Sequence, residues 1–266
     1  MYYISAAVVL VLVALGLYAP FIIKRKRNEE QESLEFAIEV INVDDKQKYM
    51  KNLAQQHSLS SYKRCSAGII RNSMRYWRNL RKNYQYLRQT PERLLSLVPS
   101  SQWIIDNYYV INRENRLLKE SFISKSYKRL PCLKNGRLNG YPRIYSVAQE
   151  MLKLSDFHLE EDTIVALLNS YQEYKPITIS ELWAFNDVLK ICLIEAINIL
   201  SNHVVQSIKT KKQADEALDR ILRNNSDYGK DIIRILEENS GVYDINTSNF
   251  IAQVLYRLKE LGEEES

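Results

Sequence analysis

Glycine and proline are scarce in this chain, which has seven and six of them among 266 residues. Seven glycines are about 2.6% of the chain, against roughly 7% in average proteins. This scarcity disfavours turn-rich β architectures and favours helices. No G-x-x-x-x-G-K-[ST], G-x-G-x-x-G or G-x-S-x-G pattern occurs, so neither a nucleotide cradle nor a nucleophile elbow is supported.

Cysteine and histidine are also scarce, with three of each. Cys65, Cys132 and Cys192 lie far apart without metal-ligand spacing. We therefore expect neither a zinc site nor a disulfide framework, and a reducing compartment fits best. The histidines are isolated in sequence, and no D-x-D pair that could hold a metal-bound sugar nucleotide occurs. We expect no catalytic residue, no metal and no cofactor in this chain, which leaves enzymatic activity undecided.

Charge is concentrated at one place. The formal net charge is +5, and the four basic residues at 24–27 are the only charged residues before position 28. Beyond them basic and acidic residues nearly balance. Net charge therefore points to no particular partner, and electrostatic arguments must be local.

A long uncharged run occupies residues 2–23. Its 22 residues, at roughly 1.5 Å each, can cross a hydrocarbon core of roughly 30 Å. The basic cluster follows the run, so the positive-inside rule places the N-terminus outside and the body in the cytoplasm. We expect residues 1–27 to be a single-pass anchor in the inner or plasma membrane, with the lipid bilayer as a partner.

The rest of the chain has helical periodicity and no useful strand pattern, which predicts an all-α fold. We expect a polar helical connector at 28–58 and a helical bundle domain at 59–266. The apolar run 188–200 predicts the central helix of the bundle, and its charged residues argue against a membrane span. The expected helices cover 28–42, 44–58, 59–89, a restart at 90–92, 100–125, 143–154, 159–174, 178 onward, 227–239 and 248–261.

Two local features stand out. One long loop, 129–143, holds two of the seven glycines and two of the six prolines. Thr178 and Glu181 have the spacing of a capping box, with Ile177 and Leu182 as a hydrophobic staple, and this predicts a helix start.

A basic stretch runs from Tyr62 to Arg93, with nine lysines or arginines and one acid, Glu92. Four aromatic residues lie among them: Tyr76, Trp77, Tyr84 and Tyr86. The stretch is compatible with nucleic acid, anionic lipid or a solvated face. Because the anchor tethers it near a membrane, lipid or a solvated face ranks above nucleic acid.

Glu195 lies in the most apolar helix, so its carboxylate must be paired or hydrogen-bonded. It is either a ligand-binding acid or one end of a structural ion pair with an arginine of the 129–143 loop, and we favour the ion pair. Aromatic residues could likewise stack on sugar rings or pack in the core, and we favour packing for most of them. They are Tyr141, Tyr145, Tyr171, Tyr174 and Trp183.

An ordered series of short blocks resembles the N-terminal region of cyclic β-1,2-glucan synthases. The resemblance is good over 101–205 and weak over 250–258. Its blocks are Asp106-Asn-Tyr108, Arg129-Leu-Pro-Cys-Leu133, Gly140-Tyr-Pro-Arg-Ile-Tyr145, Tyr171-Gln172, Pro176-Ile-Thr-Ile-Ser-Glu-Leu-Trp-Ala184 and Leu193-Ile-Glu195.

The resemblance implies a membrane-bound multidomain enzyme that builds β-1,2-glucan from UDP-glucose, cyclises it and trims it with a phosphorylase-like C-terminal part. We expect the catalytic domains to lie outside this chain, so no catalytic residue carries over. The chain departs from the family pattern at three places. Ser180 stands where the family pattern has glycine, Phe185-Asn186 stands in place of Leu-Pro, and Ala196 stands in place of asparagine.

Three functions follow as hypotheses. The first is a non-catalytic membrane anchor and scaffold for a glycosyltransferase domain or chain, with contact surface at 129–145 and the helix start at 178. There Arg129, Arg143 and Glu195 would fix the loop. The second is a module that binds β-glucan through aromatic residues. The third, which we rank lowest, is a membrane-tethered nucleic-acid-binding protein. The candidate binding residues are Arg129, Tyr141, Arg143, Tyr145, Tyr171, Gln172, Glu181, Trp183 and Glu195.

Overall fold

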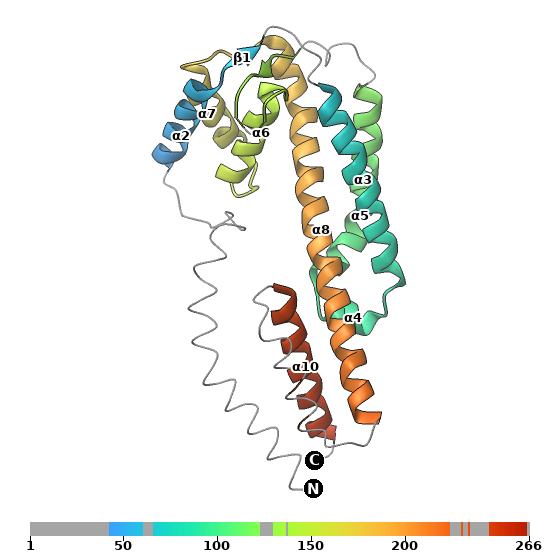
Figure 1. Ribbon diagram of the computed structural model, residues 1–266. Coiled ribbons are helices and arrows are strands. Elements are labelled where there is room, and N and C mark those ends of the chain that lie inside the picture. The colour runs from blue at the N-terminus through green and yellow to red at the C-terminus, as the bar shows by residue number, and fades with distance from the viewer. Residues whose placement is uncertain are drawn as a thin grey trace. The chain divides into compact units, whose positions relative to one another are not determined.

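The computed structural model describes residues 43–60, 66–122, 130–136, 138–223, 230, 234 and 245–264. These residues form eight helices and one pair of two-residue strands, so the predicted all-α class is confirmed (Figure 1). The predicted anchor at 1–27, the helix at 28–42, Arg129 and most of the helix at 227–239 lie outside the described residues.

The helices follow the predicted pattern closely. At 143–154 the predicted and observed bounds coincide, and at 100 the predicted start is also the observed one. The described helices are α2 (Val43–Gln56), α3 (Ser66–Gln89), α4 (Glu92–Ser96), α5 (Ser100–Phe122), α6 (Arg143–Leu154), α7 (Glu161–Gln172), α8 (Ile179–Arg223) and α10 (Ile245–Glu264).

A helix beginning at residue 59 is a wrong prediction. Leu59–Ser60 form β1, which pairs antiparallel with β2 (Cys132–Leu133), Leu59 opposite Leu133. The reason is tertiary: Lys134 N donates to Ser58 O at 2.9 Å, so this short segment exchanges backbone hydrogen bonds with the loop.

Contacts divide the chain into two compact units. The described part of the core unit lies within 43–85 and 104–202. The described part of the tail unit lies within 86–103 and 203–264.

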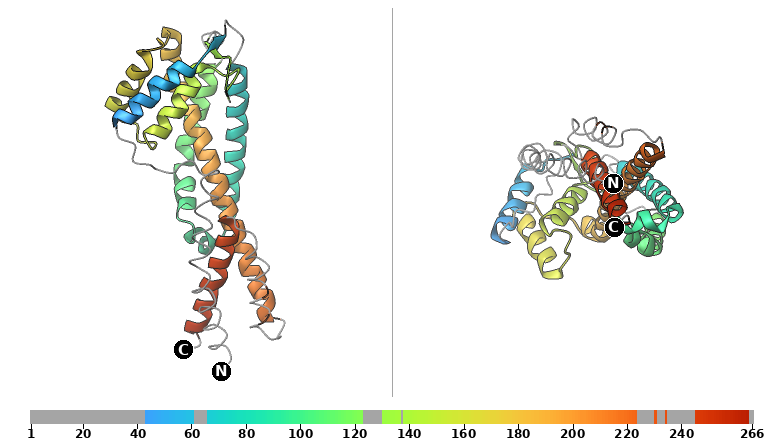
Figure 2. Two further views of the ribbon diagram at one scale, coloured as in Figure 1. Left: turned by 60° about the vertical axis from the view of Figure 1, so that its left-hand side comes forward. Right: turned by 90° about the horizontal axis from the view of Figure 1, so that it is seen from below.

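In the core unit, apolar side chains from α2, α6, α7 and α8 make one cluster. Helix α6 contributes Ile144, Val147 and Met151, none more than 1% exposed. Helix α2 lies along α7 and buries Met50 and Ala54 (Figure 2). The described half of the predicted connector is thus packed into the body.

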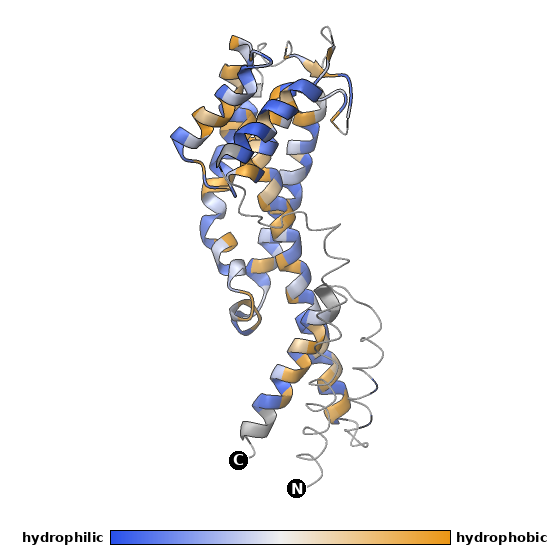
Figure 3. Ribbon diagram, turned by 90° about the vertical axis from the view of Figure 1, so that its left-hand side faces the viewer, coloured by the Kyte–Doolittle hydropathy of each residue, from blue (hydrophilic) through white to orange (hydrophobic). Residues whose placement is uncertain are grey.

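Helix α8 is far longer than the apolar run 188–200 that predicted it. It has 45 residues and includes the polar stretch after 205. Among the described helices it alone is long and apolar enough to cross a membrane, but half of its most apolar window is buried in protein. That burial matches a core helix, and apolar and polar residues are interspersed along it (Figure 3).

The predicted loop is present and folds back on itself. Gly136 and Gly140 adopt φ of +73° and +80°, a region that glycine enters without strain. Leu133 N donates to Tyr141 O and Gly140 N to Leu133 O, both at 2.9 Å. The described cysteines correct the sequence analysis: Cys132 is disulfide-bonded and Cys192 is free and buried.

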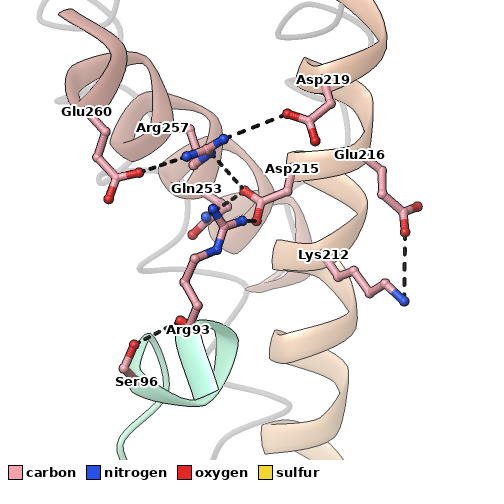
Figure 4. Close-up of polar contacts among 9 residues, drawn as sticks. All are labelled: Arg93, Ser96, Lys212, Asp215, Glu216, Asp219, Gln253, Arg257 and Glu260. Atoms are coloured by element: carbon pink, nitrogen blue, oxygen red, sulfur yellow. Dashed lines mark hydrogen bonds and ion pairs between the residues drawn. The ribbon is translucent and has the colours of Figure 1, made fainter. Parts of the chain in front are cut away.

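In the tail unit, Asp215 of α8 holds two other helices (Figure 4). Its carboxylate accepts hydrogen bonds from Arg93 of α4 at 2.6 Å and from Gln253 of α10 at 2.8 Å. Arg257 of α10 lies 3.7 Å from the same carboxylate. The Asp215 side chain is 8% exposed, whereas that of Arg93 is 59% exposed.

Candidate functional site

A buried ion pair joins the end of the loop to the start of α8. Arg143 opens α6 and Glu181 lies in the first turn of α8, with side chains 1% and 0% exposed. Arg143 Nε donates to Glu181 Oε1 at 2.9 Å, and its Nη2 donates to Glu181 Oε2 and to Pro176 O. The predicted pairing of Arg143 with Glu195 is therefore wrong, because Glu181 takes the guanidinium.

The predicted capping box is confirmed at the same carboxylate. Thr178 N donates to Glu181 Oε2 at 2.9 Å, and Glu181 N donates to Thr178 Oγ1 at 3.3 Å. Burial by itself would lower the pKa of Arg143, but the hydrogen bond and charge of Glu181 raise it above its ordinary value. One carboxylate thus caps α8 and neutralises a buried arginine.

A second polar network surrounds His57, which the sequence analysis did not single out. Its Nδ1 lies 2.7 Å from the Tyr171 hydroxyl and its Nε2 3.3 Å from Ser146 Oγ. Burial, with Arg143 and Lys175 nearby, lowers the pKa of His57 to about 4. Burial also raises the pKa of Tyr171 to about 12. The imidazole is therefore neutral at pH 7.

Glu195 is held by hydroxyl and amide groups. Tyr76 Oη donates to its Oε1 at 2.8 Å, while Tyr145 Oη and Gln149 Nε2 donate to its Oε2. Burial, reinforced by Glu195, raises the pKa of both Tyr76 and Tyr145, so the phenols stay protonated as donors. A structural carboxylate is what we expected; of the loop arginines, Arg143 is paired with Glu181 instead, and Arg129 lies outside the described residues.

Most of the predicted sugar-stacking residues are packed inside. Tyr145 and Tyr171 are 3% and 0% exposed. Tyr141 stacks on Tyr145 with ring centroids 5.5 Å apart and accepts a hydrogen bond from Asn72. Tyr145 and Tyr171 therefore pack in the core, as the favoured interpretation held, and Tyr141 is partly buried. Gln172 is partly buried at the end of α7.

Trp183, in contrast, is 78% exposed to solvent. Ile179 and Leu182, 69% and 43% exposed, share its side of α8 because the three positions have i, i+3 and i+4 spacing. Tyr174, just before the helix, is 53% exposed. We call Ile179, Leu182 and Trp183 the α8-start patch. The buried Arg143–Glu181 pair fixes the helix turn that carries it.

Few signals in the sequence could have revealed these networks. The hydrogen bonds join residues far apart in the chain, as from Tyr76 to Glu195 and from His57 to Tyr171. Only the Thr178–Glu181 cap is local. Among the described residues, no three histidine, cysteine or acidic side chains are grouped to hold a metal ion.

Comparison with known proteins supports one relationship. No protein-family model matches the chain. The chain is 28% identical over 166 residues to cyclic beta-(1,2)-glucan synthase NdvB of Rhizobium meliloti (strain 1021). The resemblance to cyclic β-1,2-glucan synthases is confirmed. The match covers 62% of this chain and 6% of that synthase, so the activity of the whole relative is not transferred here.

Proposed function

We propose that this chain is a non-catalytic, membrane-anchoring scaffold that supports β-1,2-glucan synthesis from UDP-glucose by a glycosyltransferase domain outside it. The similarity to NdvB carries this proposal. The buried chemistry supports the structural part. Glu181 is engaged by Arg143 and Thr178, and Glu195 by Tyr76 and Tyr145, so both carboxylates bind neighbouring helices.

The α8-start patch is the proposed contact with the transferase domain. Large exposed apolar side chains that lie together are typical of interaction sites. Here the exposed side chains of Ile179 and Trp183 stand on a helix turn fixed by a buried ion pair. A rigid apolar anchor of this kind loses little conformational freedom when a partner binds.

The membrane part of the proposal rests on the sequence. Residues 2–23 would span the inner or plasma membrane once, and the basic cluster at 24–27 would keep the body in the cytoplasm. Because the sequence alone supports this topology, it is tested separately with reporter fusions.

The first experiment measures the native polypeptide. An antibody raised to residues 28–266 is used on source membranes, where we expect a band several times heavier than 31.2 kDa. A band at 31.2 kDa that copurifies glucan-synthesising activity would mean a separate scaffold chain. A band of that size without such activity would contradict the proposal.

A substitution tests the contact surface. In membranes supplied with UDP-glucose, Trp183→Asp should lower β-1,2-glucan synthesis at least about tenfold, because it puts a charge at the centre of an apolar contact. Tyr109→Asp is the matched control, since Tyr109 is 70% exposed and lies on another helix of the core unit. Equal losses in both variants would contradict a contact at the patch.

A second candidate function is binding of the growing β-glucan, which the exposure of Trp183 and Tyr174 favours. Exposed aromatic faces suit the apolar faces of sugar rings. Isothermal titration with β-1,2-gluco-oligosaccharides should then give binding heat that Trp183→Ala abolishes. If the unsubstituted chain gives no binding heat, glucan binding is contradicted and the scaffold is the one proposed function that remains.

A further inference from the structure

Helix α3 carries a continuous row of cations. Its 24 residues contain six basic side chains and no acidic one. Arg71, Arg75, Arg78 and Lys82 are all exposed. Their spacing of i, i+4, i+7 and i+11 puts them on one side of the helix. We call these four residues the basic face.

A neighbouring side of α3 is fixed on α8. Asn83 Nδ2 donates to Ser201 Oγ at 2.8 Å and to Asn202 Oδ1 at 2.7 Å. Asn79 Nδ2 donates to Asn198 Oδ1 at 2.9 Å. The helix therefore cannot rotate to hide its cations.

The basic face lacks neutralising partners. Within the described part of the chain, none of its four side chains forms an ion pair with a carboxylate. Arg78 donates to Met74 O, and the Arg75 guanidinium lies 5.4 Å from the Tyr76 ring centroid. Elsewhere in the core unit Lys190 is paired with Glu114 at 2.9 Å. A rigid row of unpaired cations calls for an anionic surface.

The aromatic rings of this helix are already engaged, which argues against nucleic acid. Stacking on bases requires exposed ring faces beside the cations. Instead, the Tyr76 hydroxyl is bound to Glu195, and Tyr84 stacks on Tyr108 with centroids 3.8 Å apart. The Trp77 ring lies under the Lys119 ammonium at 3.9 Å.

A lipid surface matches what remains. Four cations spread over three turns make a straight row about 16 Å long, and a bilayer surface can meet all of them at once. Met74, 43% exposed on the same helix, offers an apolar side chain to the interface. We infer that the basic face docks on anionic phospholipid headgroups. This inference rests on the proposed anchoring of the chain in a membrane and adds a second, electrostatic contact to it.

Arginine footprinting tests the contact directly. The full chain is reconstituted in phosphatidylcholine vesicles with or without about one third phosphatidylglycerol and treated with phenylglyoxal. Modification of Arg71, Arg75 and Arg78 should fall at least about fivefold in the anionic vesicles. The protection should vanish near 1 M salt, where charges are screened within about 3 Å. Arg113, with 59% of its side chain exposed on α5, is the internal control.

A matched pair of variants isolates the four residues. The chain anchored in neutral vesicles should recruit dye-labelled anionic vesicles in a flotation assay. Recruitment should fall at least about tenfold when the basic face is changed to glutamine. The control changes four other exposed basic residues, Lys48, Arg113, Lys134 and Lys153, to glutamine and so removes the same charge.

Three results would overturn the inference. They are equal arginine modification in both vesicle types, equal recruitment by both variants, and protection by duplex RNA with none by anionic lipid. Alkaline carbonate extraction of the same vesicles separates this from the anchoring proposal. If the chain resists extraction but its arginines gain no protection, only the lipid-docking inference is contradicted. If the chain is extracted but its arginines are still protected, the anchoring proposal is contradicted.

Discussion

The carboxylate of Glu181 combines two tasks, capping α8 and balancing Arg143. Removing one member of a fully buried ion pair leaves an uncompensated charge, at a cost of about 3–5 kcal/mol. We predict that Glu181→Gln lowers the free energy of unfolding by that amount, measured by urea denaturation followed by circular dichroism. Thr178→Ala removes only the cap and should cost about 1 kcal/mol.

The matched control is another acidic residue in an ion pair that water reaches. Glu173 lies 2.7 Å from Lys51 with half of its side chain exposed. Because exposed pairs contribute little, Glu173→Gln should change stability by less than about 1 kcal/mol. If both glutamine variants unfold at the same urea concentration, the buried pair is not a major stabilising contact.

The lowered pKa of His57 makes the stability of the fold depend on pH. Its pKa is about 4 in the folded chain, against about 6.5 when unfolded. Between these values the unfolded chain binds a proton that the folded chain does not. Stability is therefore full above pH 6.5 and is lost as the pH falls towards 4, by about 2–3 kcal/mol.

The comparison with His57→Gln isolates this dependence from the titration of carboxylates. Urea midpoints are measured from pH 4 to 7.5 for both chains. The unsubstituted chain should lose more stability below pH 6.5 than the variant, while a parallel His158→Gln control at an exposed histidine keeps the full slope. Identical pH profiles for all three chains would mean that His57 titrates normally.

At the scale of the elements, the Asp215 carboxylate of α8 is one of the contacts that hold α10. Asp215 binds Gln253 of α10 and lies 3.7 Å from Arg257, whose side chain is 19% exposed. We predict that Asp215→Asn weakens the packing of α10 by about 1–3 kcal/mol, since hydrogen bonds to a charged group contribute about that much. Hydrogen–deuterium exchange in 248–260 should accelerate about tenfold or more, with exchange in α6 unchanged.

The exposed pair of Lys212 and Glu216, 3.8 Å apart on α8, supplies the control (Figure 4). Glu216→Gln should leave exchange in α10 as it was, because such pairs contribute almost nothing. Faster exchange throughout the chain in Asp215→Asn would show general destabilisation and contradict a local role for this carboxylate.

Sequence patterns predicted the elements better than their contacts. The capping box predicted the start of α8, because capping is decided within four residues. The pairing of Arg143 with Glu181 and the hydroxyl groups around Glu195 were not predictable. Which charges meet depends on how helices pack, and helical periodicity marks a buried face without naming its partner.

The same limit explains the aromatic residues. Tyr141, Tyr145 and Trp183 were equal candidates by type, yet two are packed and Trp183 is 78% exposed. Their fates depend on the neighbouring helix, as when Tyr145 faces Glu195 of α8. The length of α8 was also missed, because the polar residues after 205 looked like a break in the apolar pattern.

At the scale of the whole molecule, the open question is how many times the chain crosses a membrane. Helix α8 has the length and apolar composition of a span, but its charged residues are engaged in protein. Lys190 is 2.9 Å from Glu114, and Glu195 accepts hydrogen bonds from two tyrosines. Inserting α8 in lipid would break these contacts and put charged side chains in the hydrocarbon. Each charge there costs about 2.5–3.5 kcal/mol of free energy.

We therefore predict that the chain crosses once, through residues 2–23. Reporter fusions after residue 42 and after Ser266, made with alkaline phosphatase and with green fluorescent protein, should report the same side of the membrane. Both should be fluorescent and inactive as phosphatase, because the basic residues at 24–27 favour the cytoplasm. Opposite results at the two positions would make α8 a second span. Phosphatase activity at both positions would mean that the anchor has the opposite orientation.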